Sequence, residues 1–214
     1  MTEPSAAPCI YVIAGVNGAG KSSLMGEAIR AQGGVYYNPH EAARRLQATN
    51  AGLPVAEANS IAWRQGRRML ERAIDEHLSY NFETTLGGDT IRELLRKAAA
   101  QGHAVHVWYV GLDSVALHVA RVQLRVSKGG HAIPEQKIRE RYESSRLKLI
   151  DLLPVLASVR VYDNSFDADP GAGAAPQLQL LLEMVGGAIQ SHCPLTAAPT
   201  WVKPILAAAL SRKA

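Results

Sequence analysis

Cysteine is scarce in this chain, with only Cys9 and Cys193 among 214 residues. Two cysteines so far apart match neither a metal-ligand spacing nor a disulfide framework. Hydrophobic runs are short, and none approaches the roughly 18 apolar residues that a membrane-spanning helix needs. Residues 1–8 have no basic segment and no apolar stretch, so we expect a loose tail there and no signal peptide. These absences favour a cytoplasmic protein in a reducing compartment, with no membrane partner.

Clustered positive charge is also lacking. Lys and Arg number 23 against 19 Asp and Glu, and no basic run contains interleaved aromatic residues. A nucleic acid is therefore not an expected partner, whereas a mild positive excess suits a pocket for phosphorylated ligands. No internal repeat divides the chain, and its 47% apolar and 20% charged residues are typical of a globular domain.

What the chain does contain is a glycine-rich stretch at residues 15–22. It reads GVNGAGKS and fits the phosphate-loop pattern G-x-x-x-x-G-K-[ST]. An apolar run, 9–14, precedes this loop, and helix-forming sequence follows at 22–31. A strand, a glycine turn and a helix in this order favour an anion at the backbone N–H groups.

This loop predicts a site for ATP or GTP with Mg²⁺. We expect Lys21 to reach the β- and γ-phosphates and the Ser22 hydroxyl to take the metal. The other loop residues predicted to bind the nucleotide are Gly15, Asn17, Gly18, Ala19, Gly20 and Ser23.

Strands alternate with helices along the chain, which predicts a three-layer α/β fold with a parallel sheet of about five strands and helices on both faces. After 9–14, the expected strands are 35–37, 81–86, 104–110 and 159–162. The expected helices after 22–31 are 38–48, 57–80, 90–101 capped by Asp89, 113–126, 134–153, 177–190 and a short one near 207–209. We assign 9–176 to one domain built around the phosphate loop and 177–214 to a helical extension packed on it.

Ligands of such sheets bind beyond the carboxyl ends of the strands, where several polar residues fall. The carboxylate of Glu83 could hold Mg²⁺ through water or orient a substrate hydroxyl, while Thr84 and Thr85 could bind phosphate or substrate oxygens. Alternatively, Glu83 only caps the next turn. Asp113 fits a helix cap better than a metal ligand.

Arginines gather between residues 121 and 146, on two expected helices around the glycine break 127–131. Such a pair predicts a lid, residues 121–146, whose guanidinium groups bind phosphate oxygens. Arg121 and Arg125 share a helix face and have no acidic neighbour on it apart from Asp113, which favours a functional role. For Arg139 and Arg146, nearby glutamates favour exposed ion pairs instead.

Taken in order, these motifs resemble the zeta toxin family of small-molecule kinases. The resemblance covers roughly residues 9–166, and its FETTL, GGH and YDNS elements are more specific than the phosphate loop alone. The matching stretches are the loop, Asn38–Glu41, Phe82–Leu86, Arg121–Val126, Gly129–His131, Ile133–Glu135, Arg141–Tyr142 and Tyr162–Ser165.

The resemblance implies a kinase that uses ATP and Mg²⁺ to phosphorylate the amino-sugar hydroxyl of UDP-N-acetylglucosamine, with an antitoxin protein that blocks the ATP site. By motif it implies a catalytic set of Lys21, His40, Glu83, Arg125 and Arg141. It further implies that Arg121 and Asn164 lie at the nucleotide and that Glu41, Thr84 and Thr85 lie at the substrate.

One position departs from the family pattern. The family usually has Asn-x-Asp-Glu after the second strand, and its aspartate is the general base, whereas this chain has His40 there. An imidazole can itself take the hydroxyl proton. Glu41 or Glu83 could instead have taken over, or the chain could bind ATP as a degenerate module that acts through a protein partner.

Overall fold

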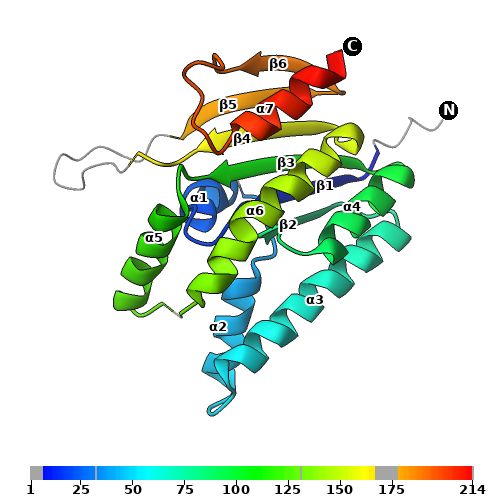
Figure 1. The fold of residues 1–214 in the computed structure, drawn as a ribbon. Helices are drawn as coiled ribbons and strands as arrows, with labels where there is room; N and C mark the ends of the chain where they lie inside the picture. Colours follow the sequence, from blue (N-terminus) through cyan, green and yellow to red (C-terminus); the bar gives the residue numbers. More distant parts are fainter. Residues whose placement is uncertain (1–6, 32, 131, 167–177, 214) are drawn as a thin grey trace.

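The computed structural model describes residues 7–31, 33–130, 132–166 and 178–213, and within them a six-stranded sheet has the order β2-β1-β3-β4-β5-β6 (Figure 1). β1 (Cys9–Ala14), β2 (Tyr80–Thr84), β3 (Ala104–Gly111) and β4 (Ser158–Asp163) run parallel. β5 (Gln179–Val185) and β6 (Ala188–His192) continue the sheet antiparallel. The mostly parallel α/β fold is thus confirmed. From β1 the chain first adds β2 on one side of β1 and then β3 on the other side, so the strand order reverses at β1.

The helices follow the expected alternation over most of the chain. His131, which belongs to the predicted GGH motif, lies outside the described residues. The helical segments are η1 (Ser22–Gly26), α1 (Glu27–Ala31), α2 (Pro39–Thr49), α3 (Val55–Asp75), α4 (Asp89–Ala100), α5 (Val115–Ser127), α6 (Glu135–Leu152), η2 (Leu153–Val155), α7 (Lys203–Leu210) and η4 (Ser211–Lys213). None of these described helices combines the length and the apolar composition that crossing a bilayer requires.

The larger core lies on the sheet face covered by α3, α4, α6 and α7, which Figure 1 shows in front of the strands. Alternation along β1 sends Ile10 and Val12 into this core, while Ile13 joins a smaller cluster with Met25 on the other face. Tyr11, also on that second face, is 41% exposed and stacks on His106. The two faces of the sheet are therefore covered unequally.

Two predicted elements are wrong. Instead of a strand at 35–37, Tyr37 alone forms a bridge to Phe82. Instead of a helix at 177–190, β5 and β6 form a hairpin around Gly186 (φ 56°) and Gly187 (φ 78°). Paired glycines with positive φ suit a two-residue hairpin turn, a signal that outweighs the leucine-rich composition of this segment.

Smaller corrections concern helix ends and the sheet edge. α3 ends at Asp75, before the predicted end at 80, and α4 is preceded by Gly88 with no side-chain cap from Asp89. Ser114, not Asp113, caps α5 by accepting a hydrogen bond from the Leu117 N–H.

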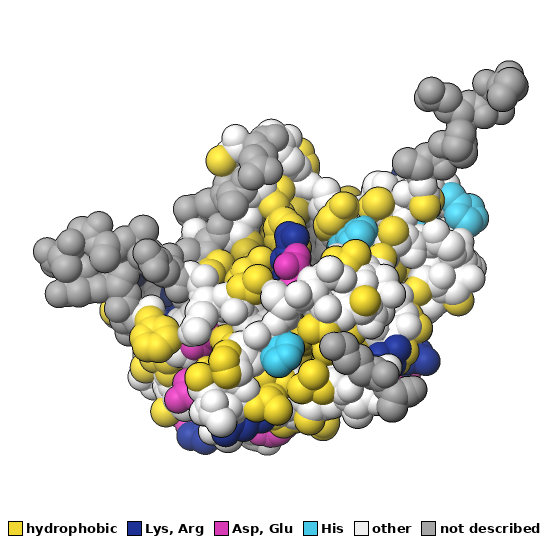
Figure 2. Space-filling model, turned by 90° about the horizontal axis from the view of Figure 1, so that it is seen from above, with side chains coloured by type: hydrophobic (Ala, Val, Ile, Leu, Met, Phe, Trp, Pro, Cys, Tyr) yellow, Lys and Arg dark blue, Asp and Glu magenta, His cyan; other side chains and the backbone are white. Residues whose placement is uncertain are grey.

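Figure 2 views the molecule from the β6 side of Figure 1 and shows hydrophobic side chains among few charged ones at this end.

The C-terminal segment packs tightly on the strand ends. The ring of Trp201 occupies the place where a side chain on Gly111 would be, since a Cβ there would lie 2.4 Å from it. Trp201 Nε1 donates to Asp163 Oδ1 at 3.1 Å, and Arg146 donates to the Trp201 carbonyl. Asp163 of the YDNS stretch therefore faces the C-terminal segment.

Candidate nucleotide and acceptor site

The phosphate loop leaves β1 in a backbone shape that glycine favours. Gly15, Gly18 and Gly20 have φ values of 138°, 85° and 87°, in the region that residues with a Cβ rarely adopt. A Cβ on Gly15 would also lie 2.1 Å from the Val110 carbonyl oxygen of β3. Glycine is needed here both for conformation and for the close approach of the loop to the sheet.

Lys21 lies at the end of this loop and is only 5% exposed. Its Nζ donates to the Val16 carbonyl at 3.3 Å and lies 3.7 Å from Glu83 Oε1. Burial lowers the pKa of Lys21, and the nearby Glu83 carboxylate opposes this shift by favouring the ammonium form. The Val16 carbonyl and the buried Glu83 carboxylate thus hold the ammonium group beside the loop.

Ser22, which is partly exposed, and the buried Asn38 and Glu83 form a hydrogen-bonded group next to Lys21. Ser22 Oγ donates to Glu83 Oε2 at 2.6 Å, and Asn38 Nδ2 donates to both of these oxygens at 3.1 Å. Asn38 Oδ1 accepts the His40 and Glu41 N–H groups and caps α2. The cap orients the Asn38 amide, and so links the start of α2 to the end of β2.

These oxygens fit Mg²⁺ bound together with a nucleotide. A hydroxyl and a carboxylate are ligands that Mg²⁺ accepts, and phosphate oxygens and water usually supply the rest of its coordination. Among the described residues, no group of three or more His, Cys, Asp or Glu side chains could hold a metal by itself. Ser22 and Glu83 would therefore hold the ion only in combination with phosphates.

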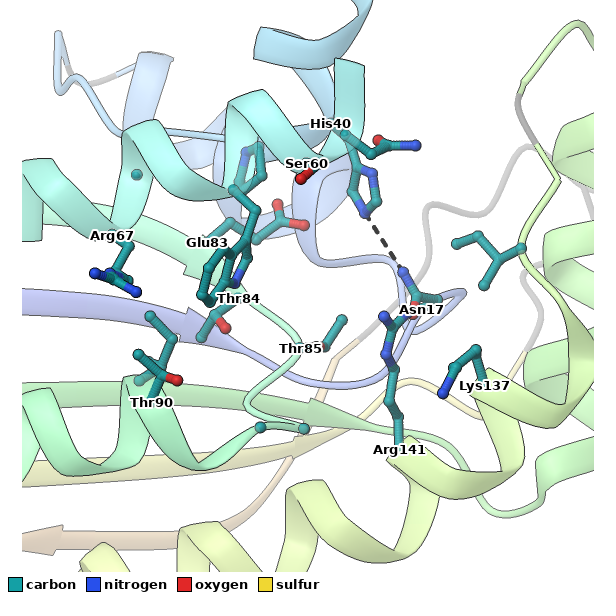
Figure 3. Close-up of a pocket in the computed structure, with 18 of the residues that line it drawn as sticks. Asn17, His40, Ser60, Arg67, Glu83, Thr84, Thr85, Thr90, Lys137 and Arg141 are labelled. Atoms are coloured by element: carbon teal, nitrogen blue, oxygen red, sulfur yellow. Dashed lines mark hydrogen bonds between the residues drawn. The ribbon is translucent and has the colours of Figure 1, made fainter. Parts of the chain in front are cut away.

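A cavity of about 520 Å³ opens beside the loop, between α2 and α3 on one side and α4 and α6 on the other (Figure 3). Aromatic rings, hydroxyl groups and three cationic side chains line it, but Glu83 is the single carboxylate among its described lining residues. The polar and aromatic lining residues are Asn17, Tyr37, His40, Asn59, Ser60, Trp63, Arg67, Phe82, Glu83, Thr84, Thr85, Thr90, Lys137 and Arg141. Two of these cations pair with carboxylates outside the lining, Arg67 with Glu71 at 3.0 Å and Lys137 with Glu140 at 2.8 Å, so the positive charge offered to an anionic occupant comes mainly from Arg141.

A chain of contacts crosses the mouth of the cavity at Asn17. Arg141 Nη1, from α6, donates to Asn17 Oδ1 at 2.8 Å, and Asn17 Nδ2 lies 3.4 Å from His40 Nε2 (Figure 3). Because Arg141 can only donate, the oxygen of the amide must face it, and Nδ2 must face His40. His40 Nε2 then has to be the acceptor, without a proton, in this arrangement. Burial lowers the pKa of Arg141.

The end of β2 presents Thr84 and Thr85 to the same cavity. Thr84 Oγ1 accepts the Leu86 N–H at 3.0 Å, and the Thr85 carbonyl accepts Ser145 Oγ at 2.7 Å. Leu86 is fully buried with φ 53°, a value uncommon for leucine, so burial and the Thr84 contact hold a strained turn. The turn fixes both threonines between β2 and α6.

Glu41 is not brought into the cavity. Its carboxylate pairs with Arg30 Nη2 at 2.6 and 2.7 Å, and Arg45 lies 3.9 Å away. Glu41 follows His40 on α2, and successive helix residues lie on different faces. Glu41 therefore pairs with Arg30 while His40 lines the cavity. Glu41 is thus not among the residues that line this cavity.

The lid arginines separate into two kinds. Arg139 pairs with Glu135 as an exposed helix pair, as predicted. Arg146 pairs with Glu143 as predicted, but it is only 12% exposed, because its guanidinium lies 4.3 Å from the Tyr142 ring centre and donates to the Trp201 carbonyl. Arg125 and Arg121 lie on α5 and are not among the residues that line the cavity.

Arg125 is nevertheless electrostatically part of the loop site. Burial lowers its pKa, Arg44 lowers it further, and Glu83 opposes both. Arg125 also lowers the pKa of Lys21. The charge of Arg125 therefore acts on both members of the Lys21–Glu83 pair.

Two other predicted nucleotide residues contact the loop itself. Ser23 is exposed, and its Oγ donates to the Gly20 carbonyl at 3.2 Å. Asn164 is 4% exposed, its Nδ2 donates to the Ala19 carbonyl at 2.9 Å, and its Oδ1 is buried without a hydrogen-bond partner. Asn164 thus supports the loop from the end of β4.

Sequence reasoning missed the contribution of α3. Asn59, Trp63 and Arg67 are spaced by four, so they share the helix face that lines the cavity, while Ala58 and Ala62 are buried. This stripe of large polar and aromatic residues beside small buried ones was the available signal. Lys137 of α6 and His118 of α5 were also missed.

A parallel sheet with a phosphate loop after β1, a buried lysine and a pair of arginine-bearing helices defines a P-loop kinase fold. The chain belongs to the zeta toxin family, whose model matches residues 1–167. An uncharacterized protein of Haemophilus influenzae is 33% identical over 131 residues, which cover 60% of this chain and 88% of that protein.

Solved structures share the fold at low identity. A chain of the AvrRxo1-ORF1:-ORF2 complex, crystallised with ATP, is 15% identical with a TM-score of 0.65, over 87% of this chain and 61% of that one. This chain therefore spans about three fifths of that protein. A chain of the PezAT toxin–antitoxin system of Streptococcus pneumoniae is 15% identical with a TM-score of 0.53, over 76% of this chain and 69% of that one.

Proposed function

We propose that this protein is an ATP- and Mg²⁺-dependent kinase that transfers the γ-phosphate to a hydroxyl of a nucleotide-sugar or related metabolite, similar to UDP-N-acetylglucosamine. One observation carries the proposal. The cavity beside the phosphate loop is lined by Asn17 and Glu83 next to the loop, and further by Trp63 and three cationic side chains. An aromatic ring and cations together suit a ligand with a base and phosphates. Family membership and a structural relative solved with ATP support the donor.

In this proposal the residues of the chain have two roles, stabilisation of negative charge and proton transfer. Bound MgATP supplies the phosphoryl group and the charge of the metal. Lys21, Arg125 and Arg141 place positive charge where the transition state gathers negative charge. His40 Nε2 gives up its 3.4 Å contact with Asn17 Nδ2 and takes the proton of the acceptor hydroxyl, as the hydroxyl oxygen bonds to the γ-phosphorus and ADP leaves. Glu83 is less suited to this step, because Ser22 and Asn38 already donate to it.

The test is product formation that depends on Lys21. Purified protein is incubated with MgATP and UDP-N-acetylglucosamine, and separately with a metabolite extract, and phosphorylated products are identified by mass spectrometry. Wild type should form a product that Lys21→Ala does not form. Lys97→Ala removes an exposed lysine paired with Asp75 and should behave as wild type. Absence of a Lys21-dependent product from both sources would overturn the proposal.

A second candidate rests on His40 in place of the family aspartate: an ATP-binding module that acts through a protein partner. It predicts ATP binding without turnover in wild type and a gain of turnover in His40→Asp. The kinase proposal predicts turnover in wild type and a loss of roughly 10²–10⁴-fold in His40→Ala, the usual range for a lost general base. Single-turnover assays of the three proteins distinguish the two functions.

We also propose an antitoxin protein as partner, because the PezAT and AvrRxo1 structures are of two-protein systems. Co-expression with the product of the adjacent open reading frame should relieve any growth defect and lower ATP affinity of the purified complex. Growth inhibition that is unchanged by co-expression would argue against that partner.

A further inference from the structure

The phosphate loop is held from one side by the two helices of the predicted lid. Val16 of the loop is 2% exposed and packs with Val122 of α5 and Ile138 of α6. A Cβ on Gly18 would lie 2.7 Å from the His118 carbonyl oxygen, so α5 approaches the loop backbone directly. The base of α5 and the phosphate loop are therefore packed as one unit.

His118 makes the polar contact within this unit. Its side chain is 1% exposed, and Nδ1 lies 2.8 Å from the Asn17 carbonyl oxygen. A carbonyl oxygen only accepts, so Nδ1 must carry the proton. Burial lowers the pKa of His118 to about 4, so the ring is neutral near pH 7. Tyr142 of α6 meets the ring edge to face at 5.6 Å and fixes its plane.

The direction of the Asn17 carbonyl decides where the next N–H points. In a trans peptide the C=O and the N–H lie on opposite sides of the bond. Because the Asn17 oxygen faces His118 on α5, the Gly18 N–H points away from α5. Backbone N–H groups of phosphate loops are the groups that hold the phosphates, so the orientation of this peptide matters for nucleotide affinity.

We propose that His118 is a positioning residue that orients the Asn17–Gly18 peptide, so that the Gly18 N–H is directed at the triphosphate. The inference rests on the proposed nucleotide site and adds a residue that the loop pattern does not contain. Two consequences follow. Loss of the His118 donor frees the peptide to turn, and the damage falls on nucleotide binding, not on the acceptor cavity.

Matched variants test this role by calorimetry with Mg²⁺ and the non-hydrolysable analogue AMPPNP. His118→Leu keeps volume and removes the donor, whereas His118→Asn places an amide N–H near the position of Nδ1. His118→Leu should bind AMPPNP about tenfold more weakly, a change of about 1.4 kcal/mol. His118→Asn should stay within about twofold of wild type. Gln123→Leu, at an exposed position of α5, is the control and should bind as wild type.

The outcomes separate this inference from the kinase proposal. Equal affinity of wild type and His118→Leu, including no measurable binding by either, would overturn the inference. Equal loss in His118→Leu and His118→Asn would also overturn it, because the effect would then be one of packing alone. A wild type that binds AMPPNP but phosphorylates nothing would overturn the kinase function and leave the role of His118 intact.

Discussion

The phosphate loop and the cavity beside it, the proposed donor and acceptor sides, are built in opposite ways. The donor side comes from eight consecutive residues, 15–22, whose glycines and lysine are placed by local backbone geometry. The acceptor side is assembled from α2, α3, β2, α4 and α6, each of which contributes one or a few side chains. A contiguous motif therefore forms the proposed nucleotide site, while dispersed residues line the proposed acceptor cavity.

Glu83 belongs to both sides, and among the variants that probe this comparison its removal should produce the largest effect. Glu83→Gln keeps the shape but takes the charge away from buried Lys21 and from the Ser22 hydroxyl. We expect kcat to fall roughly 10²–10³-fold, as for the loss of a preorganised charged group. Steady-state kinetics measure this, with exposed Glu93→Gln as control. Activity within threefold of wild type would show that the two sides do not share this carboxylate.

The pH dependence of stability tests the role of His118 on the donor side. Its pKa is lowered from 6.5 to about 4 in the folded protein, so its stabilising contribution is present above pH 6.5 and is lost as pH falls towards 4. The linked change is up to about 3 kcal/mol in the free energy of unfolding. Urea unfolding from pH 7 to 4 should show wild type losing that much more stability than His118→Asn. Parallel pH profiles would contradict a buried neutral imidazole.

On the acceptor side, Trp63 should affect one substrate only. Trp63→Ala removes a ring that lines the cavity, and we expect the KM for the acceptor to rise about tenfold with the KM for ATP unchanged. Met69→Ala, also on α3 and 41% exposed but not a lining residue, is the matched control. If KM for ATP rose equally, the two sides would not be separable.

Glu41 should have the smallest effect. Its carboxylate pairs with Arg30 near the surface, so Glu41→Gln should cost less than about 1 kcal/mol of stability and leave both KM values unchanged. Thermal unfolding and the same kinetic assay provide the measurement. A clear rise in the acceptor KM would return Glu41 to the substrate side.

The accuracy of the sequence prediction depended on how local each interaction is. The strand before the loop, α2 with Asn38 at its cap, and α6 follow patterns that are readable within a few residues. The leucine-rich segment before Gly186 was predicted as a helix because composition favoured one, yet pairing with β4 makes it a strand. In this segment, hydrogen bonding to β4, about 20 residues earlier in the chain, outweighed the helix propensity of the leucines.

By itself, the sequence determined the phosphate loop, the alternation of strands and helices, and the cluster of arginines between residues 121 and 146. These depend on neighbours in the chain, through backbone conformation and helical or strand periodicity. Tertiary structure alone decided that Asn59, Trp63 and Arg67 face the cavity, that Glu41 does not, and that His118 reaches the loop carbonyl 101 residues away. Such contacts form only when separate elements pack together, so a shared helix face can be read from the sequence but what that face contacts cannot.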